Sequence, residues 1–311
     1  MNWTVPNTES LLRRLTKPKG KIDVVLDTDT YNELDDQFAL SYMMKNSDKL
    51  NVKALYAAPF YNSKSSGPED GMLKSYDEII RLLRLAGENE ICKKVMFGSR
   101  GYLKDEKTPV ISPAANDIVS TASSYSPENP LYVVAIGAAT NIASALLLNP
   151  EIADNIVVVW LGGHARHWQD TGEFNMKQDI AAARVVMGSG APFVQLPCMG
   201  VVSEFSVSAP ELRHWLSGKN PLADYLCENT VREAERCKSA MAWTRVIWDV
   251  TAIAWLLNDE NRFMHSQITD TLLPDYNFKY EVQPIKKQMR YVTYINRDKL
   301  MTDLFLKLTD K

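Results

Sequence analysis

The sequence contains few of the residues that build thiolate metal sites and disulfide frameworks. Its 311 residues include four histidines and four cysteines, and the cysteines are scattered at Cys92, Cys198, Cys227 and Cys237 with no C-x-x-C spacing. This pattern argues against a zinc knuckle, a redox motif or a disulfide framework. We therefore expect the cysteines to be small core residues.

Long apolar runs and a strong net charge are also absent. The longest apolar runs have the length of a strand, and the N-terminal MNWTVPNTESLLRRL lacks an apolar signal core. The 35 lysines and arginines nearly balance the 38 aspartates and glutamates, so no overall field attracts nucleic acid or an anionic membrane. We expect a cytoplasmic protein whose partner is a small molecule, with no nucleic acid and no membrane involved.

What the sequence does contain is an alternation of strand-like and helix-like segments. The strand-like runs are IDVVL from residue 22, VKALYAA from 52, LYVVAIG from 131, NIVVVWLGG from 155 and APFVQLP from 191. The helical stretches are FALSYMM from residue 38, DEIIRLLRLAG ending at Gly87, ATNIASALLLNP, and IAAARVVMGSG ending near Gly188. This order predicts an α/β fold with a mostly parallel open sheet and helices on both faces.

No internal repeat or linker divides the chain, so we predict a single domain over residues 1–311. In a sheet of this kind, ligands bind beyond the carboxyl ends of the strands. The residues that follow IDVVL, LYAA, VVAI and VVWLGG should therefore converge on one crevice.

Acidic residues are concentrated directly after the first of these strands. The segment VVLDTDTYNELDDQFAL places five of them within ten residues: Asp27, Asp29, Glu33, Asp35 and Asp36. Carboxylates packed so closely either raise one another's pKa values or share a cation. Oxygen ligands without a nearby histidine or cysteine favour a hard ion such as calcium or magnesium. The segment thus indicates a metal site.

Helix capping and phosphoryl transfer could each account for part of the same segment. Asp35 and Asp36 could cap the following helix and complement its positive end, but this leaves Asp27 and Asp29 unexplained. The D-x-D spacing also suits a phosphotransferase of the haloacid dehalogenase type. Such enzymes have a threonine or valine two residues after the second aspartate, where this chain has Tyr31.

The strand, the D-x-D and the second aspartate pair resemble the inosine/uridine-preferring nucleoside hydrolase family, whose signature is D-x-D-P-G-x-D-D. The linker TYNEL is two residues longer here and lacks the Pro-Gly turn, as in a divergent branch. Further segments that resemble the family follow in its order and cover nearly the whole chain. They are ALYAAPFYN, VVAIGAATNIASAL, VVVWLGG with the later GEFNMKQDIAAAR, and RVIWDVTAIAWLL.

This resemblance implies a Rossmann-like nucleoside hydrolase fold and metal-dependent hydrolysis of the N-glycosidic bond of a ribonucleoside or related N-riboside, giving ribose and free base. It also implies a homo-oligomer, either a dimer or a tetramer. The implied cofactor is Ca²⁺, held by Asp29, Asp36, Asp249 and the carbonyl of Ile136. Asp29 would be the catalytic base, and the implied ribose-binding residues are Asp35, Asn62, Glu173 and Asn175.

Several side chains are left with two interpretations. Trp248 stands where many relatives have histidine, and it would either stack on the base or pack beside the metal. His164 and His167 follow LGG and would either lie at the crevice rim or be exposed to solvent. Our hypothesis for the longer TYNEL loop is that Asn32 and Glu33 contact the substrate.

Two alternatives remain. Some of these residues could cap helices, and the protein could bind its ligand without turnover. GEFN could be a capping pattern at a helix start, and Asp249 could cap TAIAWLL. Asp179 would support the loop or cap the next helix, and Asp27 would brace the loop at the strand end. The altered turn also leaves open a non-catalytic protein of the same fold that binds a ribose metabolite.

Overall fold

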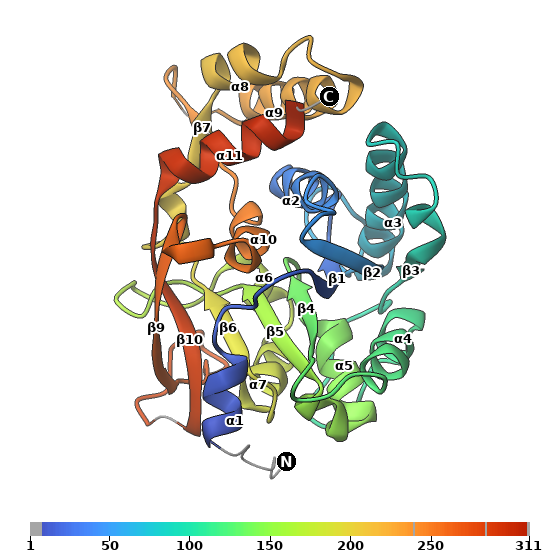
Figure 1. The fold of residues 1–311 in the computed structure, drawn as a ribbon, viewed down its shortest axis with the longest axis vertical. Helices are drawn as coiled ribbons and strands as arrows, with labels where there is room; N and C mark the ends of the chain where they lie inside the picture. The colour runs from blue at the N-terminus through green and yellow to red at the C-terminus, as the bar shows by residue number, and fades with distance from the viewer. Residues whose placement is uncertain (1–7, 239, 284, 310–311) are drawn as a thin grey trace.

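The computed structural model describes residues 8–238, 240–283 and 285–309, and a single eight-stranded sheet runs through it in the order β3-β2-β1-β4-β5-β6-β10-β9 (Figure 1). The strands of this sheet are β1 (Ile22–Thr28), β2 (Leu50–Ala57), β3 (Val95–Phe97), β4 (Leu131–Ala135), β5 (Ile156–Leu161), β6 (Phe193–Leu196), β9 (Met264–Thr271) and β10 (Ile285–Ile295). A separate two-stranded ribbon pairs β7 (Ser206–Ser208) with β8 (Thr244–Val246).

Helices connect these strands. The α-helices are α1 (Thr8–Arg14), α2 (Asp35–Met44), α3 (Pro68–Leu85), α4 (Pro113–Ala122), α5 (Thr140–Leu148), α6 (Phe174–Gln178), α7 (Ile180–Gly188), α8 (Ala209–Leu216), α9 (Pro221–Cys237), α10 (Val250–Leu256) and α11 (Arg297–Thr309). Short 3₁₀ turns are η1 (Ile91–Lys94), η2 (Pro150–Asp154), η3 (Val202–Glu204) and η4 (Asp259–Asn261). Within the described residues, no helix is long and apolar enough to cross a membrane.

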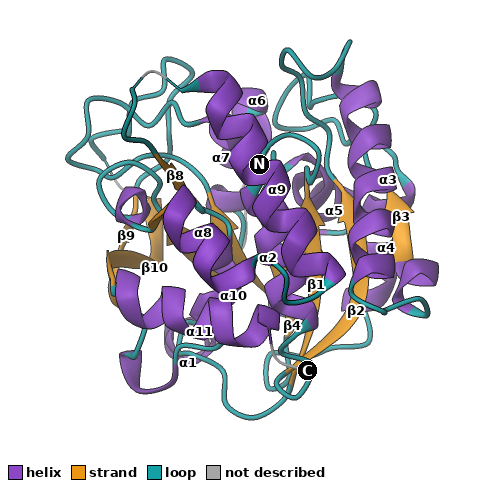
Figure 2. Ribbon diagram, turned by 90° about the horizontal axis from the view of Figure 1, so that it is seen from above, coloured by secondary structure: helices purple, strands orange, loops and turns teal. Residues whose placement is uncertain are grey.

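The central strands β4 and β5 are apolar along their whole length, and β1 is apolar in its middle, because both faces of the sheet are buried there. Successive side chains of a strand point to opposite faces. Accordingly, Val24 and Leu26 of β1 belong to one hydrophobic cluster, while Val25 belongs to the other. Helices α2, α3 and α10 pack on the first face, and α4, α5 and α7 pack on the second (Figures 1 and 2). This arrangement confirms the predicted fold class.

The chain direction creates a crevice at the middle of the sheet. Strand β1 pairs in parallel with β2 on one side and with β4 on the other. The chain therefore runs outward from β1 to β3 and then crosses back to β4. The helices that follow β1 and β4, α2 and α5, cover opposite faces of the sheet. Such a switch point opens a cleft at the carboxyl ends of the two strands.

The far edge of the sheet was not among the elements predicted from the sequence. Strand β10 pairs in parallel with β6, and β9 runs antiparallel to β10, which makes the sheet mixed at that edge.

The expectation that the cysteines are core residues was only partly correct. Cys198 and Cys227 are buried, but Cys92 is half-buried and Cys237 is exposed at the end of α9.

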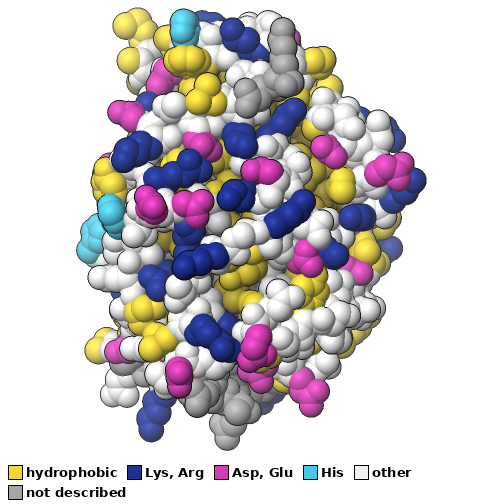
Figure 3. All heavy atoms as spheres, in the orientation of Figure 1, with side chains coloured by type: hydrophobic (Ala, Val, Ile, Leu, Met, Phe, Trp, Pro, Cys, Tyr) yellow, Lys and Arg dark blue, Asp and Glu magenta, His cyan; other side chains and the backbone are white. Residues whose placement is uncertain are grey.

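Charges of both signs are interspersed on the face of the molecule shown in Figure 3. This mixture is in keeping with the small formal net charge of −3.

Candidate active site

A cavity of about 240 Å³ opens at the carboxyl ends of the central strands. Asp29 directly follows β1, Ile136 directly follows β4, and Leu161 ends β5. Loops and helix starts contribute the remaining residues. The full set that lines the cavity is Asp29, Asn32, Glu33, Asp35, Asp36, Ile136, Leu161, His164, Glu173, Phe174, Asn175, Cys198, Met199, Trp248 and Asp249.

Four aspartates form one wall of this cavity. Asp29 comes from the end of β1, Asp35 and Asp36 from the first turn of α2, and Asp249 from the residue before α10. All four are at least nine-tenths buried. Carboxylate oxygens of Asp35, Asp36 and Asp249 all lie within 4.8 Å of one another. Residues more than 200 positions apart in the sequence thus form one acidic cluster.

Several oxygens of this cluster have no hydrogen-bond partner. Both carboxylate oxygens of Asp29 and Oδ1 of Asp249 are buried and unpartnered. An unpaired buried carboxylate is costly, and a bound cation removes that cost. The donor set consists of oxygen atoms alone, which suits a hard divalent cation. The residues present therefore fit a metal ion.

The pKa values of these carboxyl groups agree with that conclusion. Burial, followed by the neighbouring charge of Asp36, raises the pKa of Asp29 well above its usual value. Burial is also the main cause that raises the pKa of Asp249, and the charge of Asp35 is the next cause. For Asp36, burial raises the pKa to about 7. In the absence of a cation, the cluster cannot be fully ionised at neutral pH.

The structure does not support a capping role for the aspartates. The N-cap residue of α2 is Leu34, whose side chain makes no capping hydrogen bond, although Asp35 and Asp36 do lie in the first turn near the positive end of the helix. Asp249 is the N-cap residue of α10 by position, but its side chain makes no capping hydrogen bond. The Thr28 hydroxyl instead donates to Asp36 Oδ1, which fixes that carboxylate at the end of β1.

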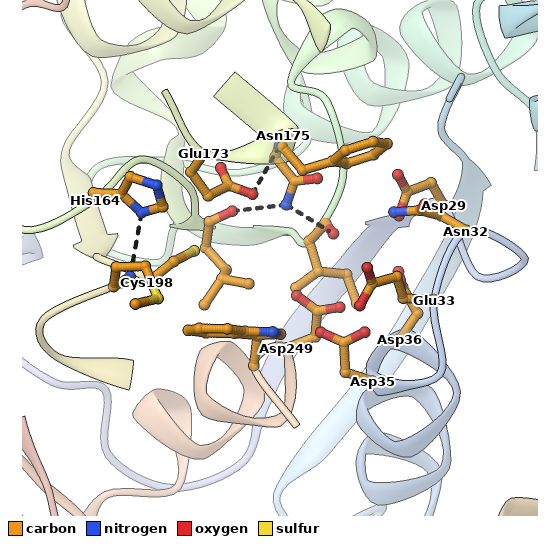
Figure 4. Close-up of a pocket in the computed structure, with 15 residues that line it drawn as sticks. Asp29, Asn32, Glu33, Asp35, Asp36, His164, Glu173, Asn175, Cys198 and Asp249 are labelled. Atoms are coloured by element: carbon orange, nitrogen blue, oxygen red, sulfur yellow. Dashed lines mark hydrogen bonds between the residues drawn. The ribbon is translucent and has the colours of Figure 1, made fainter. Parts of the chain in front are cut away.

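Glu173 and Asn175, at the start of α6, form the adjacent wall (Figure 4). Glu173 accepts hydrogen bonds from the backbone N–H groups of Gly163 (3.0 Å), Asn175 (2.7 Å) and Met176 (3.2 Å). It is the N-cap residue of α6, so the capping interpretation of GEFN holds alongside its place in the cavity. Burial raises the pKa of Glu173 to about 7.

Asn175 connects two of the central strands. Its amide Nδ2 donates to the carbonyl oxygens of Ile136 (3.2 Å) and Leu161 (3.1 Å). The Ile136 carbonyl, an expected metal ligand, therefore lies at the cavity. Close packing favours a glycine next to it, because a Cβ at Gly137 would lie 3.0 Å from Cβ of Ala58 and 3.2 Å from Cγ of Asp29.

The TYNEL loop, residues 30–34, contributes Asn32 and Glu33 to the cavity. Glu33 Oε2 accepts from Arg245 of β8 at 3.2 Å. Asn62 does not line the cavity. Its Nδ2 donates to Oδ1 of Asn32 at 2.7 Å, so it reaches the cavity through that residue.

Asp27 and Asp179 lie outside the cavity and accept hydrogen bonds from neighbouring segments. Asn141 of α5 donates to Asp27 Oδ1 at 2.7 Å. Asp179 accepts from the backbone N–H of Ala182, where it caps α7, and from Thr140 Oγ1 at 2.8 Å. These bonds hold the loops that carry the cavity residues.

The end of the cavity away from the aspartates combines apolar side chains with His164. Figure 4 shows His164 and Cys198 on one side and Asp29, Asp35 and Asp36 on the other. Leu161, Phe174, Cys198 and Met199 were not predicted as site residues, although Leu161 and Cys198 lie at the ends of predicted strands. His167, by contrast, is exposed and does not line the cavity.

Known proteins resemble this chain in sequence and in fold. A pyrimidine-specific ribonucleoside hydrolase, RihA, from Citrobacter koseri is 26% identical over 69% of this chain and 73% of its own length. A non-specific ribonucleoside hydrolase, RihC, from Salmonella paratyphi B is 33% identical over 52% of this chain and 53% of its own length. A solved plant nucleoside hydrolase superposes with a TM-score of 0.74 at 18% identity, covering 94% of this chain and 100% of that one.

The sequence profile of the family described as inosine-uridine preferring nucleoside hydrolase matches residues 24–301. That match spans the acidic wall, the Glu173 and Asn175 wall and Asp249. It confirms the predicted family and, with it, the enzyme class of hydrolases that act on N-glycosyl bonds. The chain therefore belongs to the inosine-uridine preferring nucleoside hydrolase family.

Proposed function

We propose that this protein hydrolyses the N-glycosidic bond of a ribonucleoside or a related N-riboside and releases ribose and the free base. The observation that carries the proposal is the buried cluster of Asp29, Asp35, Asp36 and Asp249, with unpartnered oxygens facing a cavity of about 240 Å³. An acidic wall of this kind can stabilise the positive charge that develops on a sugar as its glycosidic bond breaks.

The proposed cofactor is Ca²⁺, and its ligands are Asp29, Asp36, Asp249 and the carbonyl oxygen of Ile136. The unpartnered oxygens of Asp29 and Asp249 support this set, and Ca²⁺ accepts carboxylate and carbonyl ligands in flexible geometry. When bound, the ion would orient the ribose 2′- and 3′-hydroxyls and lower the pKa of a neighbouring water molecule.

Asp29 is the proposed general base, which takes a proton from the attacking water. It is fully buried at the end of β1, in a position fixed by the sheet. In the metal-free protein, burial raises the pKa of Asp29 above its usual value, so its carboxylate has a high affinity for a proton or a cation.

Asp35, Glu173 and Asn175 are the proposed partners of the ribose hydroxyls. Hydrogen bonds that strengthen as positive charge develops on the sugar favour the transition state over the substrate. Asn62 acts indirectly, because it holds Asn32 of the TYNEL loop at 2.7 Å.

Recognition of the base is proposed to involve Asn32, Glu33 and Trp248. All three side chains line the cavity, and two of them belong to the longer TYNEL loop. An indole ring can stack on a purine or a pyrimidine.

The test is the release of reducing sugar from a panel of purine, pyrimidine and nicotinamide ribosides. We expect release by the wild-type protein, and its loss both in Asp29→Asn and after calcium is stripped. Readdition of Ca²⁺ should restore the stripped protein but not the variant. A thermal unfolding curve for each sample shows that the fold is retained.

A different outcome would contradict the proposal. If ribosides and calcium raise the unfolding temperature but no sugar is released, the chain is a non-catalytic binder of a ribose metabolite. The homo-oligomeric state and the cytoplasmic location expected from the sequence stay predictions.

A further inference from the structure

The proposed chemistry leaves one task without a residue. When the C1′–N bond breaks, its electron pair moves onto the base, and a base that leaves as an anion needs a hydrogen-bond donor. The aspartates Asp29, Asp35, Asp36 and Asp249 line one wall of the cavity, and the proposed function assigns them to the metal and the ribose rather than to the base. A donor at the opposite end of the cavity would be free for this task.

His164 lies at that end (Figure 4). It is half-buried and directly follows Gly162 and Gly163, at the carboxyl end of β5. Among the titratable side chains that line the cavity in the described part of the chain, His164 alone carries an N–H group. Cys198 beside it is a poor substitute, because a thiol S–H is only a weak hydrogen-bond donor.

The surrounding backbone holds His164 in place. The His164 N–H donates to Thr171 Oγ1 at 3.3 Å, and its carbonyl accepts from the Tyr280 hydroxyl at 3.0 Å. Tyr280 in turn accepts from Gln195 Nε2 at 2.8 Å, which ties the loop to β6. The Trp168 ring contacts the imidazole edge-on, with 6.4 Å between the ring centroids. A group held this firmly can present one atom to a ligand.

A second bond sets the tautomer of the ring. The backbone N–H of Met199 donates to His164 Nδ1 at 3.3 Å. Because Nδ1 accepts, the proton of the neutral imidazole resides on Nε2. Burial is the main cause that lowers the pKa of His164, so the ring is neutral at neutral pH. Nε2 is therefore the N–H donor that this side chain offers to a ligand.

We propose that His164 Nε2–H donates a hydrogen bond to the departing base of the N-riboside, at a ring nitrogen or carbonyl oxygen that gains negative charge. This assignment rests on the proposed function and refines its substrate class to nucleosides with a neutral, acceptor-bearing base. During hydrolysis, the water oxygen bonds to C1′ and Asp29 takes a proton from that water. The C1′–N electron pair goes to the base, which then takes a proton from solvent.

The test compares leaving groups of two kinds. The bases of inosine and uridine leave as anions and need a donor, whereas nitrophenolate is a stable anion and nicotinamide leaves as a neutral molecule. We expect His164→Ala to lower kcat/KM for inosine or uridine, whichever the wild type cleaves, by about 100-fold, as when one oxyanion donor is removed. Cleavage of p-nitrophenyl riboside and nicotinamide riboside should be unchanged.

Two further variants make the comparison specific. His164→Gln keeps an N–H donor on a side chain of similar length, and it should recover part of the lost nucleoside activity even if the alanine variant folds poorly. His167→Ala alters an exposed histidine three positions along the same loop, and it should leave all four substrates unaffected.

The outcomes separate this inference from the proposed function. An equal loss on all leaving groups, or no loss on any, overturns the role of His164 while the hydrolase remains. Wild-type protein that releases neither nitrophenolate nor sugar from any riboside overturns the hydrolase itself. A selective loss on inosine or uridine supports both.

Discussion

At the scale of single residues, function and stability compete at the aspartate cluster. Asp249 is 2% exposed, and its Oδ1 has no partner. Its pKa is raised by burial first and then by the charges of Asp35 and Asp36. In the unfolded chain this group ionises freely above its ordinary pKa. Without metal, folding therefore carries a cost at neutral pH that an uncharged side chain would not incur.

Asp249→Asn tests this competition directly. We expect the metal-free variant to be more stable than metal-free wild type by about 1 kcal/mol, which raises the unfolding temperature by about 2–4 °C. The stabilisation that Ca²⁺ gives the wild type should be lost, together with riboside hydrolysis. Thermal unfolding with and without Ca²⁺ measures both effects.

Asp77→Asn is the matched control, because Asp77 is exposed on α3. It should leave the unfolding temperature and the calcium response unchanged. A metal-free Asp249→Asn protein that unfolds below the wild type would instead show that Asp249 stabilises the fold by itself.

At the scale of elements, the TYNEL loop is the departure of this chain from the family signature. Three contacts hold the loop from separate parts of the molecule. Asn62 donates to Asn32, Arg245 donates to Glu33, and Ser75 Oγ accepts from the Tyr31 N–H at 3.3 Å. A loop held in this way can present fixed groups to a ligand.

We expect Asn32→Ala and Glu33→Ala to change the relative kcat/KM values of common nucleosides. Loss of one hydrogen-bond partner costs about 1 kcal/mol, or roughly fivefold in kcat/KM. Glu69→Ala is the control, because Glu69 forms a comparable exposed ion pair with Arg100 at 2.8 Å and does not line the cavity. Identical kinetics for wild type and both loop variants would refute a role for the loop in specificity.

The sequence predicted the central strands of the sheet better than it predicted the far edge, which β9 and β10 form. Strands such as β4 and β5 are continuous apolar runs, since both of their faces are buried. β10 carries Lys286, Lys287 and Arg290, of which Lys287 is itself buried, so its apolar content is low and only a partial alternation remains. Its parallel pairing with β6, about 90 residues earlier, is a tertiary choice that no local pattern encodes.

The acidic part of the site was predictable from the sequence. Asp29, Asp35 and Asp36 stand together in one segment, and the resemblance supplied Asp249, Glu173 and Asn175. The apolar end was not predictable, because Phe174, Cys198 and Met199 belong to loops and short helices whose path depends on the whole fold. A leucine or methionine at such a position is indistinguishable in sequence from an ordinary core residue.

At the scale of the whole molecule, the buried acids link stability to pH. Burial raises the pKa values of Asp27, Asp36 and Glu173 to about 7 each. Between about pH 4 and pH 7 the folded protein therefore binds more protons at these groups than the unfolded chain does, since an unperturbed carboxyl ionises near pH 4. For metal-free protein, these groups make the free energy of unfolding fall as pH rises through that window.

Calcium should reverse this trend, because its ligands must be ionised and binding releases their protons. We expect the unfolding temperature of metal-free protein to fall between pH 5 and pH 8. The increase on adding saturating Ca²⁺ should be small at pH 5 and large at pH 8. Thermal unfolding of the two forms across this range measures both slopes. In Asp36→Asn the metal-free slope should be shallower and the calcium increment absent, which separates this cluster from the other titrating groups. A calcium increment that is equal at pH 5 and pH 8 would mean that the ion binds away from these buried carboxylates.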